Sequence, residues 1–117
     1  MSTDRPFGLP DETLSKLRGV FERHDAVHSV LIYGSRAKGT HRPGSDIDLT
    51  IKGDEIPFAE FLQIKDQIDD LMLPYTVDLS QYSQLENAEL VDHIDRISVV
   101  MFEKDAVSLE KLHDRKT

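Results

Sequence analysis

The chain has 117 residues, no cysteine and a formal net charge of -8 at pH 7. This length suits one domain around one core, and the lack of cysteine excludes disulfides and a thiolate zinc site. The negative charge opposes the phosphate attraction behind most nucleic-acid affinity, and no apolar run approaches membrane-spanning length, so a cytoplasmic protein is expected, with neither DNA nor a membrane as its main partner.

The first half of the chain predicts one helix and two strands. Residues 9–25, LPDETLSKLRGVFERHD, place apolar residues at helical spacing behind Asp11, which resembles an N-cap. Residues 28–33, HSVLIY, are mostly apolar, which predicts a buried strand that ends at Gly34. Residues 46–51, DIDLTI, alternate polar and apolar side chains, which predicts a strand with one face open to water.

The segment between these two strands is short. Residues 35–39, SRAKG, allow about one turn of helix before a Pro-Gly pair sends the chain back. The strands are therefore predicted to be antiparallel neighbours. This pairing brings the Gly-Ser pair at 34–35 against Asp46 and Asp48 at one end of the sheet.

The second half predicts two further helices and two further strands. Residues 75–80, YTVDLS, and 98–102, SVVMF, predict strands. Residues 57–73 predict a helix with a broad apolar stripe toward the core, formed by Phe58, Phe61, Leu62, Ile64, Ile68, Leu71 and Met72. Residues 85–97 predict a helix with five inward side chains, which are Leu85, Leu90, Val91, Ile94 and Ile97.

Strands that alternate with helices predict an α/β or α+β fold, with helices packed against a small sheet. No repeat or linker divides the chain, so one domain is expected over residues 1–105. Residues 106–117 form a charged C-terminal tail, expected to be a solvated helix or frayed.

Asp46 and Asp48 are the first candidates for chemistry. Residues i and i+2 of a strand point the same way, so these two carboxylates would repel each other without a partner. Mg²⁺ relieves such repulsion, because it binds one or two carboxylates and completes its shell with waters and substrate phosphates. The spacing therefore indicates a metal site.

The residues that precede these aspartates suit a phosphate group. Gly34 lets the backbone approach an anion closely, and Ser35 offers a hydroxyl and N–H groups at a helix start. Arg36 belongs to a local cationic cluster and either reaches a phosphate oxygen or remains an exposed loop charge. Together these residues indicate a triphosphate site beside the metal site.

A third carboxylate, Asp78, lies in the predicted strand 75–80, where a charge is costly unless it has a partner. In a two-metal transfer, one ion activates the attacking hydroxyl and the other steadies the leaving group. Asp78 is predicted to be the base and a ligand of the second metal, on the side of the acceptor.

Gly34-Ser35, a ten-residue gap and Asp46-Ile47-Asp48, with Asp78 in a later strand, resemble the polymerase-β-like nucleotidyltransferase superfamily. The run YGSRAKGTHRPGSDIDL looks like its minimal nucleotidyltransferase (MNT) branch, the antitoxins of HEPN–MNT toxin–antitoxin pairs. The resemblance implies an α+β fold with a small mixed sheet flanked by helices, two Mg²⁺ ions and ATP as substrate. It implies a catalytic, metal-binding set of Asp46, Asp48 and Asp78, with Gly34, Ser35 and Arg36 on the nucleotide.

Members of this type transfer AMP from ATP to a tyrosine of a helical HEPN toxin and so silence it, as type VII-like antitoxins do. A chain this short supplies one wall of a cleft, so the partner is expected to supply the other, and the chain alone could form a homodimer. Two alternatives stay open. One is a non-catalytic antitoxin that occludes its partner, and the other is the catalytic half of an aminoglycoside-type nucleotidyltransferase.

Overall fold

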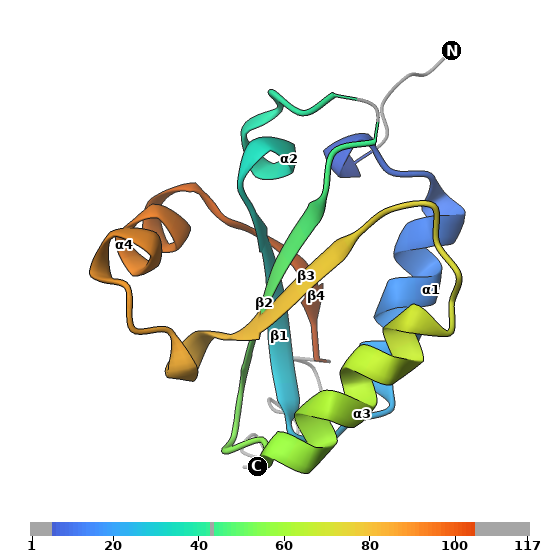
Figure 1. The fold of residues 1–117 in the computed structure, drawn as a ribbon, viewed down its shortest axis with the longest axis vertical. Coiled ribbons are helices and arrows are strands. Elements are labelled where there is room, and N and C mark those ends of the chain that lie inside the picture. The colour runs from blue at the N-terminus through green and yellow to red at the C-terminus, as the bar shows by residue number, and fades with distance from the viewer. Residues whose placement is uncertain (1–5, 43, 105–117) are drawn as a thin grey trace, which may run out of the picture.

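The computed structural model describes residues 6–42 and 44–104, so the predicted tail at 106–117 lies outside the described residues. Figure 1 shows the course of the chain through its helices and strands. The elements are η1 (Pro6–Gly8), α1 (Asp11–Glu22), β1 (Val27–Tyr33), α2 (Ser35–Lys38), β2 (Ile47–Gly53), α3 (Phe58–Asp69), β3 (Val77–Gln81), η2 (Tyr82–Gln84), α4 (Ala88–Ile97) and β4 (Val99–Glu103).

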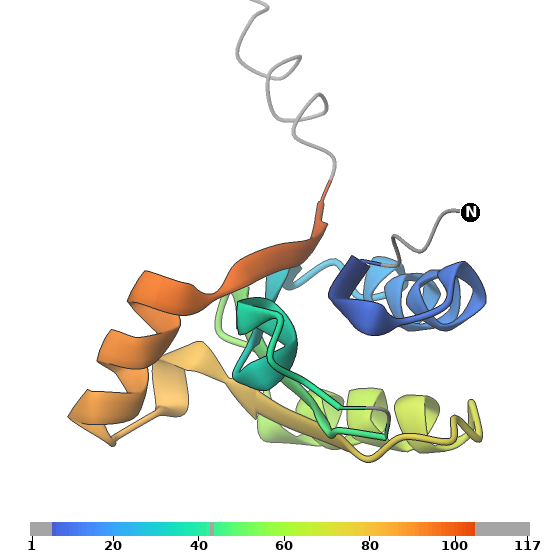
Figure 2. The ribbon, with the colours of Figure 1, turned by 90° about the horizontal axis from the view of Figure 1, so that it is seen from above.

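The four strands form one sheet in the order β3-β2-β1-β4. β1 pairs antiparallel with both β2 and β4, whereas β2 and β3 are parallel. The helices α1 and α3 cover one face of this sheet, and α4 lies on the other side (Figures 1 and 2). The predicted α+β fold with a mixed sheet is confirmed, and so is the antiparallel pairing of the first two strands.

Two apolar clusters hold the layers together. The larger one lies between the sheet and the pair α1 and α3, and it contains Leu17, Phe21, Ile32 and Leu49 among its fully buried side chains. The smaller cluster lies under α4. It consists of Leu31, Tyr33 and Ile94, with Tyr82, Leu85 and Leu90 packed around them.

The alternation of β1 explains this division, because successive side chains of a strand point to opposite faces. Val30 and Ile32 enter the larger cluster, and Leu31 and Tyr33 enter the smaller one. No helix among the described residues is long and apolar enough to cross a membrane.

The predicted first helix is correct, but the capping expectation is wrong. The N-cap position is Pro10, which makes no side-chain cap hydrogen bond, and Asp11 is instead the first residue of α1. Its carboxylate sits in the first turn, where it complements the helix dipole.

The apolar stripe predicted for α3 is only partly buried. Ile64 and Ile68 are buried, but Phe58, Leu62 and Met72 are 69%, 43% and 83% exposed. The helix packs beside an edge strand, so the sheet covers one side of a stripe that is wider than the contact. The helix predicted over 85–97 begins at Ala88, so Leu85 lies outside it, at the C-cap of η2. Within α4 only Ile94 is buried, and the other predicted inward residues are partly exposed.

This difference along α3 predicts two unequal stability losses. Ile64→Ala should lower the free energy of unfolding by about 2–5 kcal/mol, because a buried side chain leaves a cavity. Leu62→Ala should cost under about 1 kcal/mol, since its side chain is already partly in water. Urea unfolding of both variants measures the two losses, and equal losses would mean that the stripe is buried as a whole.

Candidate active site

The turn that leaves β1 lies against the start of β2. Tyr33, the last residue of β1, pairs with Asp48 of β2. Gly34 follows with φ 79°, and a Cβ placed on it would lie 2.6 Å from Oδ2 of Asp48. A side chain at position 34 would therefore displace this carboxylate. The antiparallel pairing thus brings Gly34 and Asp48 into contact, as the sequence predicted.

The three predicted carboxylates gather at this end of the sheet. Asp48 is the direct partner of Asp78 in the parallel register of β2 and β3, and Asp46 is the residue before β2 begins. Burial raises the pKa of the Asp48 carboxyl, and the charges of Asp78 and Asp46 raise this pKa further. The site therefore holds like charges whose repulsion a cation would relieve.

Burial is distributed differently from the sequence-based expectation. Asp46 and Asp78 are exposed, and only Asp48 is partly buried. The expectation that Asp78 carries a cost of burial is therefore wrong, because β3 lies at the sheet edge and its side chain reaches water. Burial instead disfavours the ionised form of Asp48, which lies in the inner strand β2.

Tyr33 is a site residue that the sequence reasoning missed. It is buried, with 8% of its surface exposed. Its ring packs edge-on against the ring of His93 of α4, and the two ring centroids are 6.4 Å apart. Its pKa is raised chiefly by burial and then by the charges of Asp78 and Asp48, while a hydrogen bond with Ser80 opposes this rise. The register was the missed signal, because antiparallel pairing puts the residue before Gly34 opposite Asp48.

A row of hydroxyl groups continues the polar face beyond the carboxylates. Ser80 Oγ donates to Thr50 Oγ1 at 2.9 Å, and these two residues are register partners two positions beyond Asp48 and Asp78. Polar side chains therefore continue along β2 and β3 on the face that carries Asp48 and Asp78.

Arg36 takes a position that neither sequence alternative anticipated. Its side chain is buried, with 3% exposed, and its guanidinium lies over the ring of Tyr75. Nη1 donates to Phe7 O at 2.8 Å, while Nη2 and Nε donate to Ser45 O at 2.8 and 3.2 Å. In this arrangement Arg36 is not an exposed loop charge, and it ties the residue before Asp46 to the N-terminal turn η1.

The donor set suits a magnesium ion better than a softer metal. All three side chains offer carboxylate oxygens, which are the ligands that Mg²⁺ prefers. Among residues 6–42 and 44–104, no three acidic or histidine side chains are close enough to form a metal cage on their own. Mg²⁺ needs only one or two protein carboxylates when phosphates and waters complete its shell, so the residues fit this ion.

Residues 15–107 match the family Polymerase beta, Nucleotidyltransferase. The chain belongs to this family. The nucleotidyltransferase is also 28% identical, over 69 residues, to a protein of Methanocaldococcus jannaschii named "Putative protein adenylyltransferase MJ1215". That similarity covers 52% of this chain and 80% of the relative.

Solved structures share the fold of this nucleotidyltransferase at low sequence identity. A chain of a toxin–antitoxin crystal structure with AMP-PNP superposes with a TM-score of 0.61 and 14% identity, over 92% of this chain and 93% of that one. A chain of the MntA-HepT toxin–antitoxin structure gives 0.60 and 10% identity, over 92% of each chain. A chain of the tri-AMPylated Shewanella oneidensis HEPN toxin in complex with its MNT antitoxin gives 0.59 and 10%, over 90% of each.

The contact between Gly34 and Asp48 predicts a specific loss on substitution. Gly34→Ala should weaken ATP binding at least about tenfold, because the new methyl group would displace the Asp48 carboxylate and strain the backbone. Gly39→Ala is the matched control, since Gly39 also has a positive φ but nothing lies within 4 Å of its Cβ position. Titration calorimetry measures both affinities, and equal affinities would mean that the nucleotide does not depend on this contact.

The raised pKa of Asp48 predicts how stability depends on pH without metal. A folded-state pKa above the unfolded value means that the ionised carboxylate destabilises the fold, and that this penalty is relieved as the pH falls through the folded pKa. Asp48→Asn should therefore unfold at higher urea concentration than the wild type at pH 7, and the difference should shrink as the solution is acidified.

Asp25→Asn controls for the general loss of one negative charge, because Asp25 is exposed in the turn before β1. Equal stabilisation by Asp25→Asn and Asp48→Asn would contradict the local repulsion at the site. So would a wild type that is more stable than Asp48→Asn at pH 7 in the presence of a chelator.

Proposed function

We propose that this protein is a Mg²⁺-dependent adenylyltransferase that moves AMP from ATP to a hydroxyl, a tyrosine in the first instance, of a helical HEPN-type toxin. It would act as a type VII-like antitoxin and meet both ATP and toxin in the cytoplasm. One observation carries the proposal. The backbone of Gly34 lies so close to Asp48 that a Cβ would collide with its carboxylate, and Asp48 is the direct register partner of Asp78.

Each residue has a role that follows from its place. Gly34 and Ser35 would bind the triphosphate through backbone N–H groups and the Ser35 hydroxyl. Asp46 and Asp48 would hold the nucleotide-bound magnesium, and Asp78 with Asp48 the second ion. When bound, the ions would neutralise the carboxylates and the phosphates and polarise the reacting oxygens. Arg36 would hold Ser45, and through it the position of Asp46, by its bonds to the backbone.

The exposed position of Asp78 on the edge strand makes it accessible to an acceptor from outside. The acceptor oxygen would attack the α-phosphorus while the bond from that phosphorus to the bridging oxygen breaks and pyrophosphate leaves. Asp78 would accept the proton of the attacking hydroxyl. The reaction balances as ATP plus a protein hydroxyl giving the AMP ester and pyrophosphate.

The similar proteins support the acceptor class. One solved complex that shares the fold contains an AMPylated HEPN toxin, and the curated relative is named for protein adenylyl transfer. The open site adds a physical reason, because transfer needs an acceptor held in line and shielded from water. The described residues provide the sheet side of such a cleft, so a protein acceptor would provide the other side.

Transfer from labelled ATP in the presence of the co-expressed partner tests the proposal. Label from the α-phosphate should appear on a partner tyrosine, with release of pyrophosphate. Asp46→Asn, Asp48→Asn and Asp78→Asn should each lower the rate by at least about a hundredfold, because each removes a metal ligand or the base. Asp25→Asn, at the other end of β1, should transfer at the wild-type rate.

The alternatives make different predictions in the same assay. If the three asparagine variants neutralise the toxin as well as the wild type does, the protein acts by occlusion and the proposal is wrong. If the isolated chain transfers AMP rapidly to small aminoglycosides and leaves the partner unlabelled, the small-molecule alternative replaces it.

A further inference from the structure

The outer side of β3 is an open strand edge. β3 stands last in the sheet, so among residues 6–42 and 44–104 only β2 pairs with it. The Ile47 N–H donates to Thr76 O at 2.9 Å, and the backbone groups of a strand alternate in direction. The N–H and C=O groups of Val77, Leu79 and Gln81 therefore point away from β2, and they are available to another strand.

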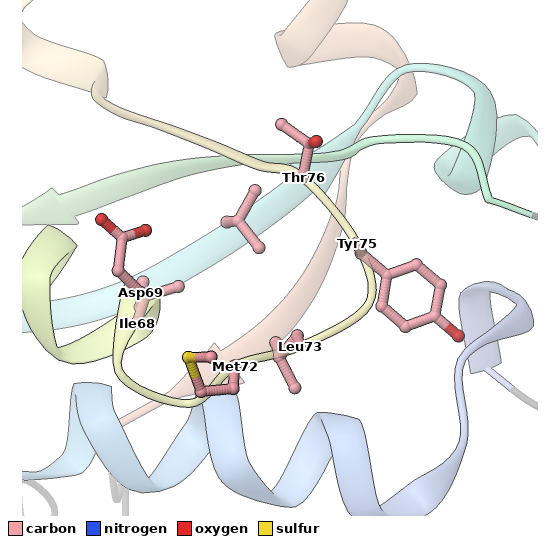
Figure 3. Close-up of a pocket in the computed structure, with 7 residues that line it drawn as sticks. Ile68, Asp69, Met72, Leu73, Tyr75 and Thr76 are labelled. Carbon is pink, nitrogen blue, oxygen red and sulfur yellow. The ribbon is translucent and has the colours of Figure 1, made fainter.

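A groove runs along this edge between β3 and α3. It begins as a hollow of about 450 Å³ beside the loop that joins the two elements, which Figure 3 shows with Met72, Leu73 and Thr76 around it. Val77 lines both this first hollow and a second one. Leu79 lines both the second hollow and a third, which extends to Phe58. Gln81 links the third to a further hollow at the end of β3. The hollows thus lie in a row along β3, and the row is narrowest at the second hollow, which has a volume of only about 10 Å³.

The wall and rim of this β3–α3 groove define the chemistry of its occupant. The α3 side presents Phe58, Ile68 and Met72, and Phe58 and Met72 are more than two thirds exposed. The charged side chains that line the hollows are Asp69, Glu55 and one cation, Lys65, and the exposed Asp78 lies on the same strand. An occupant that carries apolar side chains and positive charges would complement this surface.

We propose that the β3–α3 groove binds an extended, cationic segment of the protein substrate, which pairs with the edge of β3 and so brings its acceptor hydroxyl beside Asp78. The role of this segment as a carrier of the acceptor hydroxyl rests on the proposed adenylyl transfer. The docking surface itself rests on the open edge, the groove and the charge.

Strand geometry connects the groove to the catalytic face. Val77 and Leu79 point to the α3 side, and Asp78, between them, points to the opposite side with Asp48. A strand added at about 4.8 Å from β3 would divide its side chains in the same way. Its apolar residues would enter the groove, and the alternate residues, including the acceptor, would rise beside Asp78.

Charge favours a substrate segment over a second copy of this chain. The chain has a formal net charge of -8, and the groove lining adds two carboxylates against one lysine, so two copies that meet there would repel each other. The carboxylates of the site add to this preference for a cationic segment.

A designed peptide tests the surface without knowledge of the natural partner. The probe is a fluorescein-labelled nonapeptide, Lys-Val-Lys-Val-Tyr-Val-Lys-Val-Lys, whose valines match the groove side and whose tyrosine and lysines match the site side. Two further versions carry backbone N-methyl groups at either the odd or the even residues. Only one set of amides can face β3, so one version should bind on the order of tenfold more weakly and the other should bind unchanged.

Substitutions in the protein complete the test. Phe58→Asp should weaken peptide binding on the order of tenfold, because it puts a charge on the apolar wall. Val100→Asp is the matched control, since Val100 is 49% exposed on β4, the opposite edge of the sheet. In NMR spectra of the wild type, the amides of Val77, Leu79 and Gln81 should shift and exchange more slowly when the peptide binds.

The outcomes separate this inference from the proposed function. Equal binding by both N-methylated versions, no binding at all, or amide shifts confined to β4 would overturn the docking surface. A dimer that Phe58→Asp dissociates, with no peptide binding, would assign the groove to a second copy and also overturn it. Peptide bound in the groove without AMP transfer to any hydroxyl would uphold the docking surface and count against the proposed function. Transfer to the toxin at full rate by Phe58→Asp would uphold the proposed function and count against the docking surface.

Discussion

The contact of Gly34 with Asp48 is the constraint on which the site depends. Antiparallel pairing of β1 and β2 fixes it, since Tyr33 lies opposite Asp48 and Gly34 comes next in the chain. Any side chain at position 34 would collide with the carboxylate oxygen. The same register that fills the core from one face of β1 therefore determines how closely the backbone at position 34 approaches the acidic residues.

The fold accepts a local electrostatic cost at this point. Asp48 and Asp78 are neighbours across two parallel strands, and Asp46 adds a third negative charge nearby. Like charges directly opposite one another destabilise a sheet. The large apolar cluster under α1 and α3, and the bonds from Arg36 to Phe7 O and Ser45 O, hold the surrounding chain in place against this repulsion. Such a concentration of unrelieved charge is characteristic of a functional site.

The sequence was sufficient to predict the elements, the pairing of the first two strands and the meeting of Gly34 with Asp48, because periodicity and a short connection determine all three. It could not predict the burial of individual residues at the sheet edge. Burial of Asp78 and Phe58 follows only if β3 has neighbours on both sides, and strand order is a tertiary property. The burial and hydrogen bonds of Arg36 could not be predicted either, because its acceptors, Phe7 O and Ser45 O, lie in other segments of the chain.

A crystal structure with Mn²⁺ and a non-hydrolysable ATP analogue would test the central claim most directly. The anomalous signal of manganese identifies the position of the metal without any assumption about its ligands. The account predicts a metal peak at about 2.2 Å from carboxylate oxygens of Asp46 and Asp48, with the triphosphate against the backbone of Gly34 and Ser35. A metal and triphosphate bound elsewhere on the sheet, with these residues left uncontacted, would contradict it.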